Sequence, residues 1–101
     1  MLPATVGEWT LDEALLFYGR GGDAIYPASA GSNHPVASFA DFLDKPAFSG
    51  DRVVCGTDSD SAPTCYIQTG DLGVVLVSDP AALVSVDDLA AFADAFAAQV
   101  G

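Results

Sequence analysis

The two cysteines constrain the fold of this chain more than any other feature. Cys55 and Cys65 are separated by a polar segment, 56–64, that is rich in turn-forming residues. The runs that flank it, 52–54 and 66–68, hold β-branched and aromatic residues typical of strands. This pattern predicts a β-hairpin closed by a Cys55–Cys65 disulfide, a cross-link worth roughly 3 kcal/mol in the entropic account. The sequence therefore predicts a protein that matures outside the reducing cytoplasm.

Length and charge narrow the class of protein. The chain has 101 residues, half of them apolar, which predicts a single compact domain over 1–101. Fourteen acidic residues face three basic ones, and the net charge of −11 disfavours nucleic acid and anionic membrane surfaces as partners. The longest strongly apolar run, 74–77, is too short to span a bilayer, so we expect no direct membrane insertion by this segment.

The acidity has a second interpretation. A halophile coats its cytosolic proteins with carboxylates, so a halophilic cytosolic interaction protein is an alternative. The cysteine pair favours secretion over that alternative. The chain also opens on Leu2 and Pro3 without a basic and apolar leader, and we interpret it as a domain excised from a longer membrane-anchored or secreted protein, with Met1 added for expression.

The first half of the chain reads as two strands followed by a short helix. Residues 8–18 are expected to form an extended lead-in and a strand, and the glycine-rich segment 19–22 a tight turn. A second strand follows over 23–27, then a loop over 28–35. Phe39, Phe42 and Leu43 share one helical face after the N-cap candidate Ser38, and Pro46 ends this helix.

The second half reads as three strands and a helix. The strands are expected at 51–56, 64–69 and 73–78. Ser85 is the predicted N-cap of the last helix, with Asp87 and Asp88 in its first turn. The order β-β-α-β-β-β-α predicts an α+β, two-layer sandwich with a mainly antiparallel sheet of about five strands and both helices on one face.

His34 is the natural candidate for a catalytic base. It is the single histidine, and Ser29 and Ser32 lie near it in sequence. A Gly-x-Ser-x-Gly elbow is missing, however, and closeness along a loop does not build a triad. We therefore expect no catalytic residues, and keep a small hydrolase-like domain using His34 as an alternative.

Metal binding is the next candidate chemistry. Asp58 and Asp60, with neighbouring hydroxyls, make the predicted hairpin tip a candidate Ca²⁺ site. Ala62 and Pro63 stand where an EF-hand loop has its next ligand and its glycine, which favours a solvated turn. Two cysteines and one histidine also leave a structural zinc site one ligand short. No metal or other cofactor is predicted.

Aromatic residues suggest a binding surface. We assign Trp9 and Phe17 to the core, and expect Tyr26 and Tyr66, together with His34, to form the exposed candidate surface. An open sheet edge could also support a weak homodimer or accept a partner strand.

Four features together resemble a known group of proteins: the opening Leu-Pro-x-Thr-Val-Gly-x-Trp at 2–9, the Ala-x-Tyr strand at 24–26, the cysteine pair, and the strand 75–77 before an alanine-rich helix. They resemble the extracytoplasmic domains of uncharacterised actinobacterial membrane proteins and lipoproteins. The resemblance implies an anchor upstream and a location outside the cytoplasm. It supplies no activity or site residue.

The sequence thus favours a non-catalytic extracytoplasmic binding or sensor module. Its expected partner is an unidentified protein or cell-envelope ligand.

Overall fold

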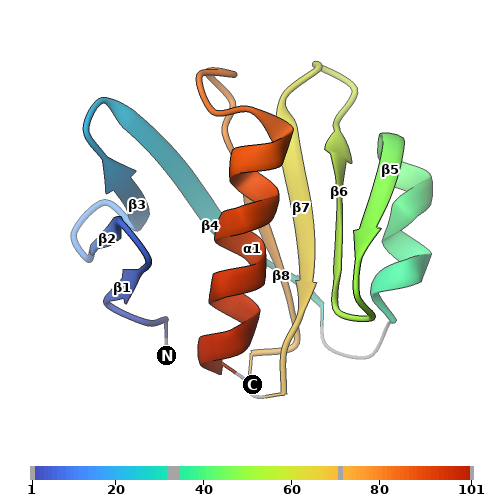
Figure 1. Cartoon of the computed structure of the whole chain (residues 1–101), viewed down its shortest axis with the longest axis horizontal. Helices are drawn as coiled ribbons and strands as arrows, with labels where there is room; N and C mark the ends of the chain where they lie inside the picture. Colours follow the sequence, from blue (N-terminus) through green and yellow to red (C-terminus); the bar gives the residue numbers. More distant parts are fainter. Residues whose placement is uncertain (1, 32–34, 71, 101) are drawn as a thin grey trace.

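Eight antiparallel strands form one curled sheet around a C-terminal helix (Figure 1). The structure is a computed structural model that describes residues 2–31, 35–70 and 72–100. Along the sheet the strands follow the order β1-β2-β3-β4-β8-β7-β6-β5. The elements are β1 (Thr5–Val6), β2 (Trp9–Asp12), β3 (Phe17–Arg20), β4 (Asp23–Gly31), the 3₁₀ helix η1 (Val36–Phe42), β5 (Asp44–Ser49), β6 (Val53–Thr57), β7 (Pro63–Gln68), β8 (Val74–Ser78) and the helix α1 (Val86–Val100).

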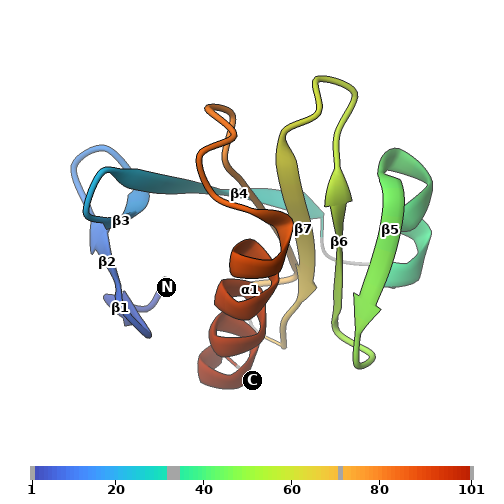
Figure 2. The same ribbon diagram turned by 45° about the horizontal axis from the view of Figure 1, so that its top comes forward.

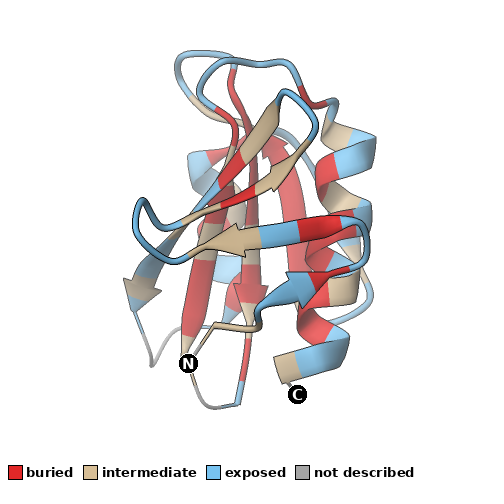
Figure 3. Cartoon of the chain, turned by 90° about the vertical axis from the view of Figure 1, so that its left-hand side faces the viewer, coloured by how far each residue is buried: buried red, intermediate tan, exposed pale blue. Residues whose placement is uncertain are grey.

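Helix α1 fills the concave side of the sheet. Its apolar stripe is buried against residues from seven of the eight strands, since β1 to β4 and β6 to β8 all contribute to the main core. Phe92 lies at the centre, with its ring centroid 5.1 Å from that of Tyr18 and 5.8 Å from that of Trp9. Figure 3 shows the N-terminal strands crossing in front of the remaining strands, with buried residues concentrated between sheet and helix. The predicted N-cap Ser85 of α1 is confirmed, because Asp88 N–H donates to Ser85 Oγ at 3.1 Å. The predicted N-cap Ser38 is wrong, since it lies inside η1, which begins at Val36 after Pro35.

The two helices cover opposite faces of the sheet, so the prediction that both lie on one face is wrong. Val53 and Cys55 of β6 belong to the core beneath α1, whereas Val54 between them packs with Val36 and Leu43, at the two ends of η1. Successive side chains of a strand point to opposite faces. The unbroken burial of β6 therefore requires a cover on each side, and η1 provides the second one.

The sheet has eight strands, where about five were predicted. Segment 5–20 folds into three strands of two to four residues, too short for a regular alternation of apolar and polar side chains to be readable. Strand β5 was missed because Lys45 and Pro46 read as the end of a helix. Lys45 adopts a positive φ of 51°, and a register shift between Asp44 and Ala47 lets the strand pair with β6. The α+β class and the antiparallel pairing are confirmed.

Strand β4 changes partner along its length. Its first residues, 23–25, pair with β3, whereas Tyr26 and the residues after it pair with β8. Figure 2 shows β4 running across the molecule from β3 to β8. The expected loop at 28–35 is therefore partly strand, since β4 continues to Gly31.

The disulfide joins directly opposed residues of β6 and β7, as predicted. Cys55 and Cys65 are register partners with Cα atoms 4.1 Å apart. Gln68 N–H donates to Arg52 C=O three register positions away, and hydrogen-bonded pairs alternate along the ladder, so Cys55 and Cys65 occupy a pair without mutual backbone hydrogen bonds. Both side chains are buried beneath α1, in the main core.

Removing the disulfide should cost about 3 kcal/mol of unfolding free energy, because the loop between the cysteines is then unconstrained in the unfolded chain. The measurement is urea unfolding of the protein and of the Cys55→Ala/Cys65→Ala variant. A reductant should act slowly on the folded protein, since it reaches the buried sulfurs only when α1 opens. Equal stability of the two proteins would contradict the structural role of the bond.

Gly56→Ala should destabilise the fold by about 1–3 kcal/mol, because β5 passes too close for a methyl group. A Cβ at this position would lie 2.6 Å from Asp44 O and 3.1 Å from Leu43 Cβ. The matched control is Gly22→Ala, where a Cβ meets nothing within 4 Å. The control should change the unfolding free energy by less than about 0.5 kcal/mol, and an equal loss in both variants would refute the packing argument.

Candidate functional site

The candidate site is a groove between the N-terminal strands, β4 and the end of α1, apolar in its first part and mixed polar and apolar in its second. It consists of two hollows of about 320 Å³ and 450 Å³ that share Leu2 and Leu72. The volumes lie in the range of small-molecule and peptide-anchor sites. The first hollow is lined by Leu2, Leu16, Pro27, Ala28, Ser29, Leu72 and Val75. The second is lined by Leu2, Pro3, Ala4, Glu13, Leu72, Gln99 and Val100.

The N-terminal wall is fixed by hydrogen bonds to its backbone. Tyr18 Oη donates to Pro3 C=O at 2.6 Å, and Gln99 Nε2 donates to Thr5 C=O at 2.8 Å. Leu11 N–H donates to Ala4 C=O at 2.8 Å. These bonds hold residues 2–5 against β2, β3 and α1, so Leu2 is presented to both hollows.

The wall that carries Leu16 is a turn, which Asp12 stabilises through hydrogen bonds. Its Oδ1 accepts hydrogen bonds from the N–H groups of Ala14 and Leu15, and Leu16 N–H donates to its C=O at 2.8 Å. Leu16 adopts a φ of +55°, a conformation that is costly for a bulky side chain. Leu15 is 71% exposed and Leu16 57%. The turn thus holds two exposed leucines, and the strained one, Leu16, lies at the rim of an apolar hollow.

The floor of the groove is the second part of β4 with the adjacent β8. Pro27 pairs with Val77 and Ser29 with Val75, and Ser29 is exposed. Because β3 pairs with β4 only as far as Ile25, the edge of β4 from Pro27 onward faces the groove.

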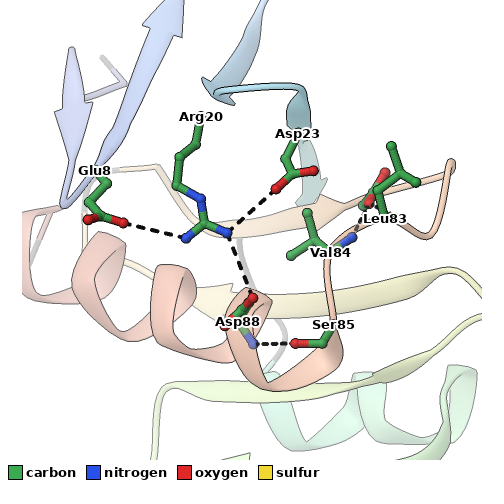
Figure 4. A network of polar contacts seen from close by, with 8 residues as sticks. Glu8, Arg20, Asp23, Leu83, Val84, Ser85 and Asp88 are labelled. Carbon is green, nitrogen blue, oxygen red and sulfur yellow. Dashed lines mark hydrogen bonds and ion pairs between the residues drawn. The ribbon is translucent and has the colours of Figure 1, made fainter.

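The electrostatic environment of the groove is negative. Glu13 is the one charged residue among its described lining residues. Arg20, the nearest basic residue in sequence, is already surrounded by Glu8, Asp23 and Asp88 at 3.6–3.7 Å (Figure 4). Its guanidinium also lies over the ring of Trp9.

The other two basic residues do not change this balance. Arg52 donates through Nε to Gln68 C=O, and Lys45 lies on β5 at the far edge of the sheet. Neither lines the groove.

Asp79 is a structural residue that sequence reasoning missed. Its buried carboxylate accepts hydrogen bonds from Ala81 N–H, Leu83 N–H and Val84 N–H, at 2.7–3.0 Å. These bonds order the loop that leads into α1. The signal in the sequence was an Asp-Pro pair between a strand and a helix, which is typical of turns.

The Ca²⁺ candidates form an ordered turn. Asp58 Oδ1 accepts hydrogen bonds from Asp60 N–H at 2.8 Å and from Ala62 N–H at 2.9 Å. Within the described residues, no group of three or more His, Cys, Asp or Glu side chains could hold a metal ion.

The aromatic candidates lie on the outer face of the sheet. Tyr26 is 45% exposed and its ring lies 5.8 Å from that of Phe17. Tyr66 stacks on Phe39 of η1 at 4.7 Å, two strands away from Tyr26. Burial raises the pKa of Tyr66, and the nearby Asp58 carboxylate adds to the rise. His34, the third member of the predicted surface, lies outside the described residues.

Comparison of the chain with protein-family models, curated proteins and solved structures finds no match. Among the described residues, no helix is long and apolar enough to cross a membrane.

Tyr18 should make stability fall at alkaline pH. Burial raises its pKa from 10.0 to about 12. The folded protein thus favours the neutral phenol, so this contribution to stability is complete below pH 10 and is lost as the pH rises through about 12. Relative to Tyr18→Phe, the unfolding free energy of the parent protein should fall by about 2–3 kcal/mol across this pH range.

Urea unfolding across this alkaline range is the measurement. The half-exposed Tyr26 provides the control, since Tyr26→Phe should retain the pH dependence. Tyr66 is present in every protein compared, so its contribution to the pH dependence cancels. An unchanged pH dependence in Tyr18→Phe would show that Tyr18 is not its source.

Proposed function

We propose that this protein is a non-catalytic, extracytoplasmic binding module whose groove receives apolar groups of a partner. The observation that carries this proposal is the exposed, strained Leu16 at the rim of a hollow lined by apolar residues. Backbone strain persists where the surrounding structure enforces it, and it concentrates at sites of binding and catalysis. Exposed apolar surface next to a concavity is the usual form of a binding site.

The chemistry of the lining supports binding over catalysis. The first hollow offers one hydroxyl, from Ser29, and the second one carboxylate, from Glu13, among their described side chains with acid, base or nucleophilic groups. General acid-base or nucleophilic catalysis needs at least two such groups in contact. These two residues line different hollows.

The disulfide supports the proposed location outside the cytoplasm. Cysteine pairs of this kind persist in oxidising environments and are rare in the cytosol. The Cys55–Cys65 bond is buried in the main core, so an environment that keeps it oxidised stabilises the fold.

Leu16→Gly should separate binding from stability. Glycine adopts a positive φ freely, so the variant should be as stable as the parent or more stable by up to about 1 kcal/mol. The substitution also removes the leucine side chain from the wall of the hollow, so affinity for the neutral fluorescent probe N-phenylnaphthylamine should fall about tenfold. The measurements are probe titration and urea unfolding.

Ala82→Gly is the matched control. Ala82 has a φ of +56° but lies in the loop before α1 and does not line the groove. It should gain similar stability with unchanged probe affinity. Equal weakening in both variants, or no probe binding to the parent protein, would overturn the proposed function.

A further inference from the structure

The groove contains an open strand edge. Beyond Ile25, strand β3 no longer pairs with β4, because the chain turns away at Leu16. The residues of β4 that follow still pair with β8 on their other side. An edge of this kind carries backbone groups that can pair with another chain.

The direction of these backbone groups follows from the ladder. In an antiparallel pair, successive residues direct their N–H and C=O alternately toward the two neighbouring strands. Asp79 N–H donates to Pro63 C=O and Thr69 N–H to Gly73 C=O, so the odd-numbered residues at 73–79 point to β7. The even-numbered residues of β8 therefore point to β4.

The even-numbered residues Tyr26 and Ala28 are the register partners of Ser78 and Leu76, so they bond to β8. Pro27 and Ser29 consequently point the other way, into the groove. Proline has no N–H, so the open edge presents Pro27 C=O, Ser29 N–H and Ser29 C=O. Proline at an edge position is tolerated for this reason.

The surroundings of this edge select the side chains of an added strand. Leu16, Leu72 and Val75 provide apolar contacts beside it. Glu13 lies in the adjoining hollow, and none of the ion pairs among the described residues involves it. With a net charge of −11, the protein attracts a basic segment and repels an acidic one.

We infer that the groove binds an extended segment of a partner protein by strand addition to the Pro27–Ser29 edge, with apolar side chains in the first hollow and a Lys or Arg near Glu13. This inference rests on the proposed function and names the class of partner. A second copy of the chain fits poorly, because two copies would bring together surfaces of the same charge. Main-chain pairing supplies affinity and the side-chain hollows supply specificity.

The first experiment uses an N-acetylated, C-amidated Lys-Leu-Val-Leu-Lys peptide, titrated into the full chain and followed by amide NMR. It should bind with shifts at Leu16, Ser29 and Val75 and slower hydrogen exchange of Ser29 N–H. A version with N-methylated backbone amides keeps the side chains and the C=O acceptors but cannot donate to the C=O groups of Pro27 and Ser29, and it should bind about tenfold more weakly. Equal binding of the two peptides would overturn strand addition.

The second experiment changes the protein. Ser29→Pro removes the N–H at an edge position and should weaken peptide binding about fivefold. Ser29→Ala keeps the N–H and is the matched variant, so it should bind the peptide about fivefold more tightly than Ser29→Pro. If Ser29→Pro does not fold, the N-methylated peptide still tests pairing on the unaltered protein, through the C=O groups of Pro27 and Ser29. Equal affinity of the two folded variants would count against pairing at this residue.

The third experiment tests charge. Glu-Leu-Val-Leu-Glu should bind at least tenfold more weakly than the lysine peptide, and Glu13→Gln should weaken the lysine peptide about twofold to threefold. Equal affinity for both peptides would overturn the basic partner, and peptide-independent dimerisation in sedimentation would favour a second copy.

These outcomes are distinguishable from failure of the proposed function. Probe binding that depends on Leu16, without a preference for peptides able to pair, would keep the groove and reject strand addition. Loss of both would reject the groove itself.

Discussion

The burial of Phe92 against Trp9 and Tyr18 is the contact on which the rest of the structure depends. The three rings meet in edge-to-face or near edge-to-face geometry and connect α1 to β2 and β3. Aromatic pairs of this kind add a directional term to a large hydrophobic one. They curl the N-terminal strands around the helix, so the sheet encloses α1 in place of lying flat beneath it.

That curl has a consequence for the groove. Because β1 to β3 turn toward α1, they leave β4 after Ile25, and β8 alone continues the pairing. The strand edge, the Asp12 turn and the N-terminal segment then surround a common concavity. Tyr18 contributes to both the core and the groove, because its ring packs on Phe92 while its hydroxyl donates a hydrogen bond to Pro3 C=O. The core and the groove therefore share a residue.

The disulfide reinforces the opposite half of the molecule. It joins β6 to β7 directly beneath α1, in the core on which the helix packs. Helix η1 completes this half by covering Val54 and Tyr66 from the other side. The buried Asp79 carboxylate orders the loop before α1 by accepting hydrogen bonds from three backbone N–H groups.

The strongest local signals were readable in the sequence. Three elements were predicted close to their observed places: the cysteine hairpin, the strand at 74–78 and the capped helix α1. In each of them, a hydrophobic pattern and the turn or cap residues that bound it lie within a few residues of one another. Strand β5 and the short N-terminal strands were not, since their pairing partners compensate for residues that alone disfavour a strand. The groove was not readable either. Leu16 looked like part of the first strand, and Pro27 like the end of the second.

The sequence by itself determined the α+β class, the cross-linked hairpin and the acidic charge, because these follow from local pattern and composition. The tertiary structure alone decided that the sheet curls, that the helices take opposite faces and that Pro27 and Ser29 border a groove. Those features depend on which distant segments of the chain meet. The contacts that stabilise them join residues far apart in the sequence, so a local pattern does not reveal them.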